Sequence, residues 1–235
     1  KNFPKFLIFI LNLINEKCNY IKKYCADNDM FFLEASVELP PEAVAEAKQI
    51  WDEGFFVKHR GGEASGWHSC ALYGWGIKEP EYYRTMNPSG YGFTEKEVTW
   101  GFTEIAEIAP HMKKFLEDTF DVSNLRRCRF MMLEPGGWIK AHDDGKERSI
   151  WSAINAAITQ PENCYLRRAD TLLEVPFKPL HVFYYDNRVV HEAENNSNER
   201  RFHFIIHGFR GDKTKQVLID SFERDYGEIK LPISK

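Results

Sequence analysis

A histidine and two acids follow a proline and two glycines in the stretch "EPGGWIKAHDDGKERS". His142 and Asp144 stand two residues apart. Side chains at positions i and i+2 of a strand point to the same face, so both could bind one metal ion. Asp143 would then point to the opposite face, but it replaces Asp144 as the acidic candidate if the segment is a loop. A His-x-Asp pair alone is usually a solvated pair of polar residues.

A third metal-ligand candidate is His191, which follows the apolar run and turn "LHVFYYDNRVV". Two histidines and one carboxylate on one face of Fe(II) leave three coordination positions open. That arrangement is typical of non-haem iron oxygenases.

Arg201 stands ten residues after His191, at the start of the β-rich run "RFHFIIHG". An arginine inside a β core is costly unless it meets an anion. A dicarboxylate co-substrate that chelates iron would provide one, because guanidinium binds carboxylate through paired hydrogen bonds. Arg200 competes for this role. Strand alternation favours Arg201, because it places Arg201, His203, Ile205 and His207 on one face and Phe202, Phe204 and Ile206 on the other.

The elements that must position these residues are mostly strands. From Arg126 onward, short β-rich runs alternate with turn residues such as Pro135-Gly136-Gly137 and Asp186-Asn187. These runs are "RCRFMML", "WIKAH", "SIWSAINAAI", "NCYLRR", "TLLEVPF", "LHVFYYD", "VVHEAEN" and "RRFHFIIHGF". Many short strands at this spacing indicate a sandwich or barrel. The arginine run Arg126–Arg129 is interpreted as a charged strand end.

The remaining elements are mixed. We expect strands at 30–39 and 66–76, a helix after Pro40-Pro41, and a helical segment over "DKTKQVLIDSFERDYG". Residues 103–120 have helical spacing, with Thr103 as N-cap and a kink or break at Pro110. The chain is thus predicted to be one domain, mainly β with flanking helices. Residues 126–210 form most of its core, 1–125 pack on and extend it, and 211–235 close it with a helix.

Composition excludes several classes of protein. The formal net charge is −4 without a basic block, so nucleic acid is not an expected partner. The most apolar stretch, Phe6–Ile14, falls far short of the ~20 residues that span a bilayer, and we expect a buried amphipathic helix and no membrane partner. Five cysteines without C-x-x-C spacing argue against a disulfide framework and favour a reducing, cytoplasmic location.

Four segments carry a family resemblance: "FVKHRGGEASGWHSCALYG", "RFMMLEPGGWIKAHDD", "SAINAAITQPENCYL" and "VVHEAENNSNERRFHFIIHG". They resemble the aspartyl/asparaginyl β-hydroxylase-like branch of the Fe(II)/2-oxoglutarate-dependent oxygenases. The resemblance implies a double-stranded β-helix, which is a jelly-roll barrel of the cupin type. It implies Fe(II) held by His142, Asp144 and His191, 2-oxoglutarate bound by Arg201, and O2 as the second co-substrate. The expected substrate is an amino acid or a residue of a peptide or protein.

The acid at position 144 bears on the reaction. Some members of this branch lack the acidic ligand, so Asp144 favours a complete triad. A halogenase of this fold has a small residue there, which disfavours halogenation. The substrate itself would be selected by the loops at 60–67 and 76–91.

For the other candidate pocket residues, the sequence allows both a structural and a functional role. Asn155 is a polar residue in an apolar strand, and it either satisfies the core or touches a ligand. His203 is either a satisfied interior histidine or a donor to a ligating group. Trp151, Met131 and Tyr184 either line the same cavity or belong to the core. His59, Arg60 and Trp67 either contact substrate or pack and cap.

The rival hypothesis is a cupin-like jelly roll that binds a metal or small ligand without oxidising anything. Such a protein has no particular need for a buried arginine ten residues after its last histidine. Arg201 is therefore the residue that separates the two hypotheses.

Overall fold

The computed structural model describes residues 5–59, 64–76, 88–145, 153–208 and 211–231, with side chains from residue 11 onward. The helices are α1 (Lys5–Asp27), α2 (Ala43–Asp52), α3 (Ile105–Ile108), α4 (Pro110–Thr119) and α5 (Asp212–Tyr226), with short 3-10 turns at Pro88–Tyr91 and Val122–Asn124. The strands are β1 (Phe32–Glu38), β2 (Val57–Lys58), β3 (Ala64–Gly76), β4 (Thr99–Phe102), β5 (Leu125–His142), β6 (Ala153–Ala157), β7 (Cys164–Arg168), β8 (His181–Tyr185), β9 (His191–Asn195) and β10 (Arg201–Gly208).

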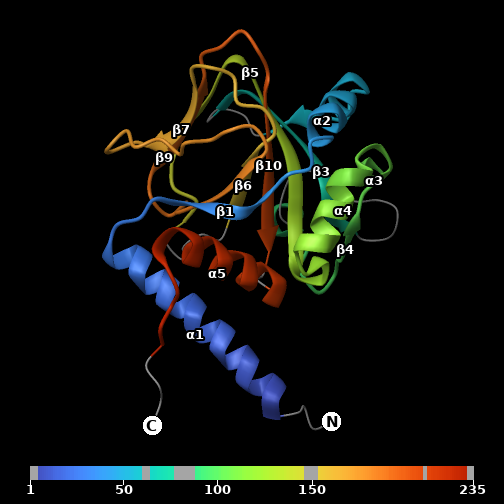
Figure 1. Ribbon diagram of the computed structural model, residues 1–235. Helices are drawn as coiled ribbons and strands as arrows, with labels where there is room; N and C mark the ends of the chain where they lie inside the picture. Colours follow the sequence, from blue (N-terminus) through green and yellow to red (C-terminus); the bar gives the residue numbers. More distant parts are fainter. Residues whose placement is uncertain (1–4, 60–63, 77–87, 146–152, 209–210, 232–235) are drawn as a thin grey trace.

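The strands form a jelly roll of two facing antiparallel layers. The larger layer has the order β1-β8-β6-β10-β5-β3-β2, with β4 beside β3. The smaller layer contains β7 and β9 and the second half of β5. Figure 1 shows β7 and β9 standing apart from β6 and β10. The predicted fold class, mainly β with flanking helices around a double-stranded β-helix, is confirmed.

Strand β5 joins the two layers. Along one edge it pairs with β3 both before and after Gly137. Along the other edge its first half pairs with β10 and its end pairs with β9. The prediction of a turn at Pro135-Gly136-Gly137 is wrong, because β5 runs through these residues. Gly136 has φ +70°, which lets the strand bend. A Cβ on Gly137 would lie 2.8 Å from the Glu134 carbonyl oxygen, so only glycine fits this crossing.

Side-chain alternation separates the two faces of the larger layer. One face packs against the helices in a single hydrophobic core that includes Cys70, Leu72, Phe130, Met132, Tyr184, Phe202 and Phe204 from the strands, and Ile21, Ile50, Met112, Leu116, Leu218 and Phe222 from the helices. The opposite face looks toward β7 and β9. This second face can therefore hold polar groups without interrupting the main core.

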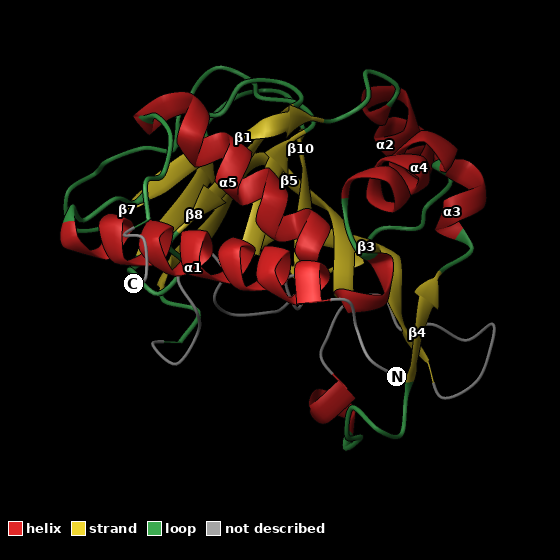
Figure 2. Ribbon diagram, turned by 60° about the horizontal axis from the view of Figure 1, so that its bottom comes forward, coloured by secondary structure: helices red, strands yellow, loops and turns green. Residues whose placement is uncertain are grey.

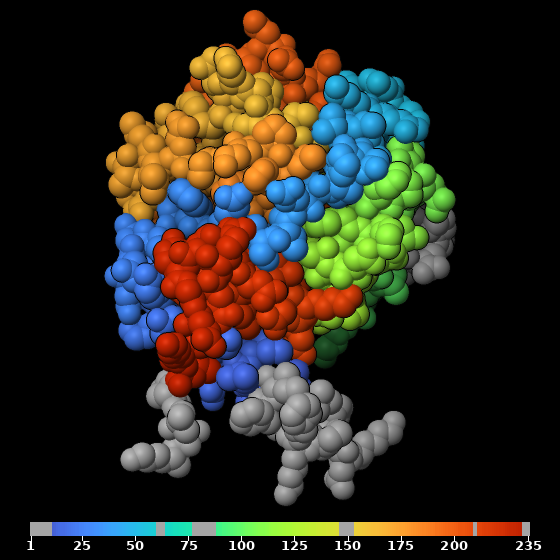
Figure 3. Space-filling model, in the orientation of Figure 1, coloured from blue at the N-terminus to red at the C-terminus, as the bar shows by residue number. Residues whose placement is uncertain are grey.

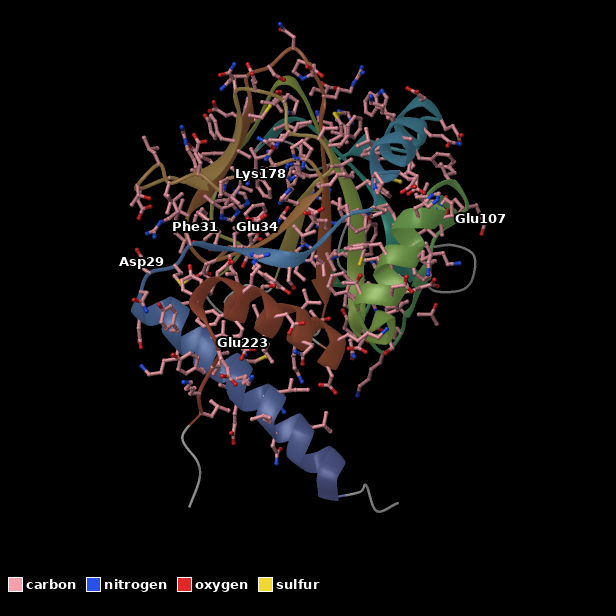
Figure 4. All side chains as sticks on the ribbon, viewed as in Figure 1. Asp29, Phe31, Glu34, Glu107, Lys178 and Glu223 are labelled. Atoms are coloured by element: carbon pink, nitrogen blue, oxygen red, sulfur yellow. The ribbon has the colours of Figure 1, made fainter. Side chains whose placement is uncertain are left out.

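Helices α1 and α5 lie side by side over the β1 end of the larger layer (Figure 2). The rings of Tyr24 and Phe222 meet edge-on with centroids 5.1 Å apart. Lys17 forms a 2.7 Å ion pair with Glu223, which Figure 4 labels where α5 approaches α1. The space-filling view shows the α5 segment in red against the blue of α1 (Figure 3). The apolar sides of both helices pack on the sheet and shield its outer face from water.

The helical segment predicted over 103–120 is two helices. Pro110 begins α4, and Ala109 before it leaves helical geometry with φ −118° and ψ 60°. Proline has no N–H to continue the preceding helix, which explains the break. The predicted N-cap, Thr103, is off by one residue, because the N-cap of α3 is Glu104; the Thr103 hydroxyl still accepts a hydrogen bond from the Ile105 amide at 3.2 Å. Glu46 of α2 accepts from the first amides of α4, at His111 (2.8 Å) and Met112 (3.1 Å).

The strand predicted at 171–177 is absent, and the cysteines and the helices can also be compared with the sequence analysis. The run "TLLEVPF" contains no named strand, only an isolated bridge between Arg167 and Glu174. Pro176 lacks the N–H that a ladder needs, which explains the failure. All five cysteines are buried, and each is present as a thiol and not in a disulfide bond. Among the described residues, no helix has the length and apolar character needed to cross a membrane.

Candidate active site

A cavity lies between the two layers of the jelly roll. Most of its lining comes from alternate residues of the strands, as a strand period of two favours. Strand β5 contributes Arg127, Arg129, Met131, Leu133, Ile139 and His142; β10 contributes Arg201, His203, Ile205 and His207; other strands and loops contribute His59, Trp67, Asp144, Asn155, Tyr185, His191 and Glu192. Of the pocket residues predicted from sequence, Arg60 and Trp151 lie outside the described residues.

His142 and His191 stand opposite each other in the antiparallel pair β5–β9. Their ring centroids are 4.6 Å apart, and Asp144 Oδ1 lies 3.8 Å from His142 Nε2. Two atoms that each lie ~2.0–2.2 Å from one ion are at most ~4.4 Å apart, so 3.8 Å is compatible with a shared ion. Within the described part of the chain, no three His, Cys, Asp or Glu side chains are placed closely enough to coordinate one metal ion as they stand. His142, Asp144 and His191 are therefore neighbours, but their ligating atoms do not yet surround one point at coordination distance.

The imidazoles are held in the tautomer that a metal ligand needs. Nδ1 of His142 lies 2.7 Å from the Lys140 carbonyl oxygen, and Nδ1 of His191 lies 2.8 Å from that of Val189. A carbonyl oxygen only accepts, so each Nδ1 carries the hydrogen and each Nε2 keeps its lone pair. Burial lowers the pKa of His191 and favours its neutral form. This donor set fits a divalent ion such as Fe(II).

The two neighbouring acids are in different surroundings. Asp143 Oδ1 accepts a hydrogen bond from the Gly145 amide at 2.9 Å, within its own turn. Asp144 lines the cavity, and its Oδ2 accepts from Asn187 Nδ2 at 2.8 Å. Strand β5 ends at His142, but the Asp144 amide still donates to the Asn187 carbonyl at 2.9 Å. That bond extends the alternation by two residues and turns Asp144 to the side of His142.

Arg201 is only 4% exposed and points into the cavity, whereas Arg200 is exposed and lies over the Trp51 ring at 4.7 Å. Arg201 Nε donates to Gln160 Oε1 at 3.1 Å, and Nη1 to the Tyr165 carbonyl at 3.4 Å. Nη2 is buried and has no hydrogen-bond partner among the described residues. Burial lowers the pKa of Arg201 to about 10, so the guanidinium is still charged at neutral pH.

Two more polar atoms of the cavity are buried without a partner in the described structure: Asn155 Nδ2 and His203 Nε2. Strand pairing places His203 opposite Ala157 and Asn155 opposite Ile205, on the rungs that follow Arg201. A buried polar group left unpaired costs ~1–3 kcal/mol, so such atoms are expected to have a ligand. Burial, with Arg201 adding to it, holds the pKa of His203 well below its usual value. The arrangement suits an anionic, multiply hydrogen-bonded ligand.

The sequence left open whether Met131 and Tyr184 line this cavity or belong to the core. Met131 lines the cavity, whereas Tyr184 packs in the core under the helices. Tyr185 lines the cavity instead, and its hydroxyl oxygen lies 3.5 Å from His191 Nε2. Adjacent strand residues face opposite sides, so the choice depended on a register that the sequence did not provide.

The interpretation of Arg126–Arg129 as a charged strand end is also wrong for its last residue. Arg129 is 5% exposed and lines the cavity, opposite Ile205 and therefore four residues along β10 from Arg201. His59 and Trp67 line the same region, their rings edge-on at 4.2 Å. His59 Nδ1 is bonded to Ser69 Oγ at 2.8 Å, and Arg129 Nη1 lies 3.5 Å from His59 Nε2. Strand alternation from Met131 was the signal that would have found Arg129.

The chain was compared with known proteins. No curated protein matches it. Solved structures that resemble it include a prolyl-4-hydroxylase from Pseudomonas putida, with 13% identity and a TM-score of 0.42 over 81% of this chain and 98% of that one. A Trichoplax adhaerens prolyl hydroxylase in complex with a hypoxia inducible factor peptide fragment has 10% identity and a TM-score of 0.48 over 88% and 96%.

A third structure, a viral collagen prolyl hydroxylase from Paramecium Bursaria Chlorella virus-1, has 12% identity and a TM-score of 0.41 over 76% of this chain and 96% of that one. The family model described as aspartyl/asparaginyl β-hydroxylase matches residues 41–210. That range contains His142, Asp144, His191 and Arg201 together with every strand of the jelly roll except β1. The chain belongs to the aspartyl/asparaginyl β-hydroxylase family of oxygenases.

Proposed function

We propose that the protein is an Fe(II)- and 2-oxoglutarate-dependent hydroxylase. The observation that carries the proposal is one cavity with two complementary sites. It contains a His-Asp-His group whose imidazoles bond carbonyl oxygens through Nδ1 and present Nε2 to the cavity, and a buried arginine with an unpartnered N–H in the described structure. A metal-binding cupin alone would account for the first site but not for the second.

His142, Asp144 and His191 would hold the iron and leave three coordination positions for co-substrate and O2. When bound, iron, O2 and 2-oxoglutarate together convert a C–H bond to an alcohol and release succinate and CO2. The chain's own residues orient and shield these partners. Buried apolar residues such as Leu133, Ala193 and Leu166 line the cavity and reduce the access of water.

Arg201 would bind the distal carboxylate of 2-oxoglutarate. Its Nε and Nη1 are held by Gln160 and Tyr165, so the guanidinium is fixed before the ligand arrives. Asn155 and His203 offer two further polar atoms along the same wall. A ligand that pairs with all three residues would remove the unpaired buried groups, which supports a dicarboxylate over a neutral ligand.

The substrate we propose is an amino acid, or a residue of a peptide or protein. The name of the matching family points to an aspartyl or asparaginyl side chain. The wall formed by His59, Trp67, Arg127 and Arg129 supports a polar or acidic group at this position. The five free thiols favour a reducing compartment such as the cytoplasm.

Anaerobic calorimetry with Mn(II) and 2-oxoglutarate tests the co-substrate role. Arg201→Ala should weaken 2-oxoglutarate binding at least ~100-fold, because removing one partner of a buried charge pair costs ~3–5 kcal/mol. Arg200→Ala is the matched control, since Arg200 points outward, and it should bind within twofold of wild type. Mn(II) binding should survive in both variants.

Three results would count against the proposal. Wild-type protein that binds Mn(II) but no 2-oxoglutarate would favour a metal-binding cupin. Unchanged affinity in Arg201→Ala would remove this arginine from the co-substrate site. Failure to find a +16 mass shift coupled to succinate release, in a screen of amino acids and Asp- or Asn-containing peptides, would argue against hydroxylation of these substrates.

A further inference from the structure

We propose that Asn187 is a positioning residue that aims the Asp144 carboxylate at the metal site. The inference rests on the proposed role of Asp144 as a metal ligand. Asn187 is fully buried, although it lies in the loop between β8 and β9. A polar loop residue with no exposed surface needs hydrogen-bond partners inside the protein, and Asp144 is one partner of Asn187.

The contact has two hydrogen bonds that act in opposite directions. Asn187 Nδ2 donates to Asp144 Oδ2 at 2.8 Å, and the Asp144 amide donates to the Asn187 carbonyl at 2.9 Å. The backbone bond fixes where the Asp144 residue lies. The side-chain bond fixes how its carboxylate is turned. With Oδ2 held by Asn187, Oδ1 is the oxygen that lies on the side of His142, 3.8 Å from Nε2.

The same loop also orients the second histidine. The Val189 carbonyl accepts from His191 Nδ1 at 2.8 Å. The loop is itself fixed, because the Asp186 amide donates to the Phe31 carbonyl at 2.8 Å and the Asp186 carboxylate pairs with Arg188 at 2.7 Å. Five consecutive residues, 186–190, therefore tie Asp144 at the end of β5 to His191 at the start of β9. The ligands are linked through protein before any ion binds.

A ligand oriented in advance binds metal more tightly, because less ordering is left for the binding step. Asp144 follows the end of β5 and is partly exposed, with 21% of its side chain accessible. The hydrogen bond from the Asn187 side-chain amide limits the rotation of the Asp144 carboxylate. Loss of the amide should affect metal affinity through Asp144 and not through the fold.

Mn(II) titration of the full-length metal-free chain, in a double-mutant cycle, tests this. Asn187→Ala should weaken Mn(II) binding at least ~10-fold, the usual effect of losing a partner of a metal ligand. Asn187→Leu keeps most of the side-chain volume without the donor, and should lose the same amount if the alanine variant folds poorly. In an Asp144→Ala background, adding Asn187→Ala should change the affinity by less than twofold.

The outcomes separate orientation from simple structural support. Equal losses in both backgrounds would mean that Asn187 supports the loop in general, and would overturn the inference. Wild-type affinity in Asn187→Ala and Asn187→Leu would overturn it as well, while leaving the proposed function in place. Failure of the wild-type chain to bind Mn(II) would overturn both the inference and the proposed metal site.

Discussion

At the scale of single residues, the candidate site depends on which atoms are already engaged. Both imidazoles use Nδ1 to bond a carbonyl two residues earlier, in the same way, and keep Nε2 for another partner. Arg201 uses Nε and Nη1 and keeps Nη2. The unused atoms, and not the residue types alone, distinguish this cavity from a polar core.

The two adjacent acids provide a matched pair for testing the metal site. Asp144→Ala should weaken Mn(II) binding by at least ~10-fold and abolish hydroxylation, because it removes the only anionic ligand of the triad. Asp143→Ala should leave Mn(II) affinity within about threefold, because Asp143 bonds its own turn at Gly145. Calorimetric titration of both variants checks the pair. A larger loss in Asp143→Ala than in Asp144→Ala would move the ligand role to Asp143.

At the scale of elements, one strand and one loop bring the site together. β5 crosses from the larger to the smaller layer at Gly136 and Gly137, and so presents Arg129 in one layer and His142 in the other. The loop between β8 and β9 then returns to the end of β5 through Asn187. The site is therefore built at the point where the two layers are connected, and among the described residues no helix contributes to its lining.

The helices on the outer face should affect stability without affecting the site. Glu46 is 5% exposed and bonds the His111 and Met112 amides and His111 Nδ1. Glu46→Ala should lower the free energy of unfolding by about 2 kcal/mol, because it leaves the start of α4 without its acceptor. Glu42→Ala, an exposed position without a side-chain cap bond, should cost less than about 0.5 kcal/mol.

Urea unfolding of both glutamate variants measures the difference. Equal losses would show that the buried carboxylate of Glu46 gives no specific stabilisation to α4. Mn(II) affinity should be unchanged in both variants, since α2 and α4 contribute no residue to the cavity.

At the scale of the whole molecule, a polar cavity inside a jelly roll makes stability depend on pH. In the folded state, burial and the Arg201 charge hold the pKa of His203 well below 6.5. Below pH ~6.5 the unfolded chain takes up a proton at this position while the folded chain does not, so the free energy of unfolding falls as the pH falls. Above pH ~6.5 the residue is neutral in both states and contributes no pH dependence.

Substitution at His203 should therefore flatten the acid side of the stability curve. His203→Gln should reduce the slope between pH 6 and pH 5 by up to ~1.4 kcal/mol per pH unit, the value for one proton. Urea unfolding of metal-free protein at several pH values measures this slope. His68→Gln, which changes a histidine outside the cavity, serves as the comparison. A slope in His203→Gln as steep as in wild type would contradict the prediction.

The sequence by itself determined the fold class and most of the elements around the site. The strand period of two was enough to predict that Arg201, and not Arg200, points into the barrel, because adjacent residues of a strand face opposite sides. Arg201 is buried in the cavity, and Arg200 lies over the Trp51 ring. The same period left the place of Tyr184 open, because the sequence did not say which face was buried under helices and which lined the cavity. In the structure Tyr184 lies in the core and Tyr185 lines the cavity.

Only the tertiary structure decided what depends on long-range pairing. The proline and two glycines before Trp138 have the composition of a turn, yet β5 continues through them because β3 pairs with it on both sides, while its other neighbour changes from β10 to β9. Asn187 and Asp144 are 43 residues apart, and no local pattern connects them. Residue types fix which groups can bind a metal or a carboxylate. Strand register, and the way the loop between β8 and β9 folds back onto the end of β5, arise from contacts far apart in the chain. They fix which of those groups meet.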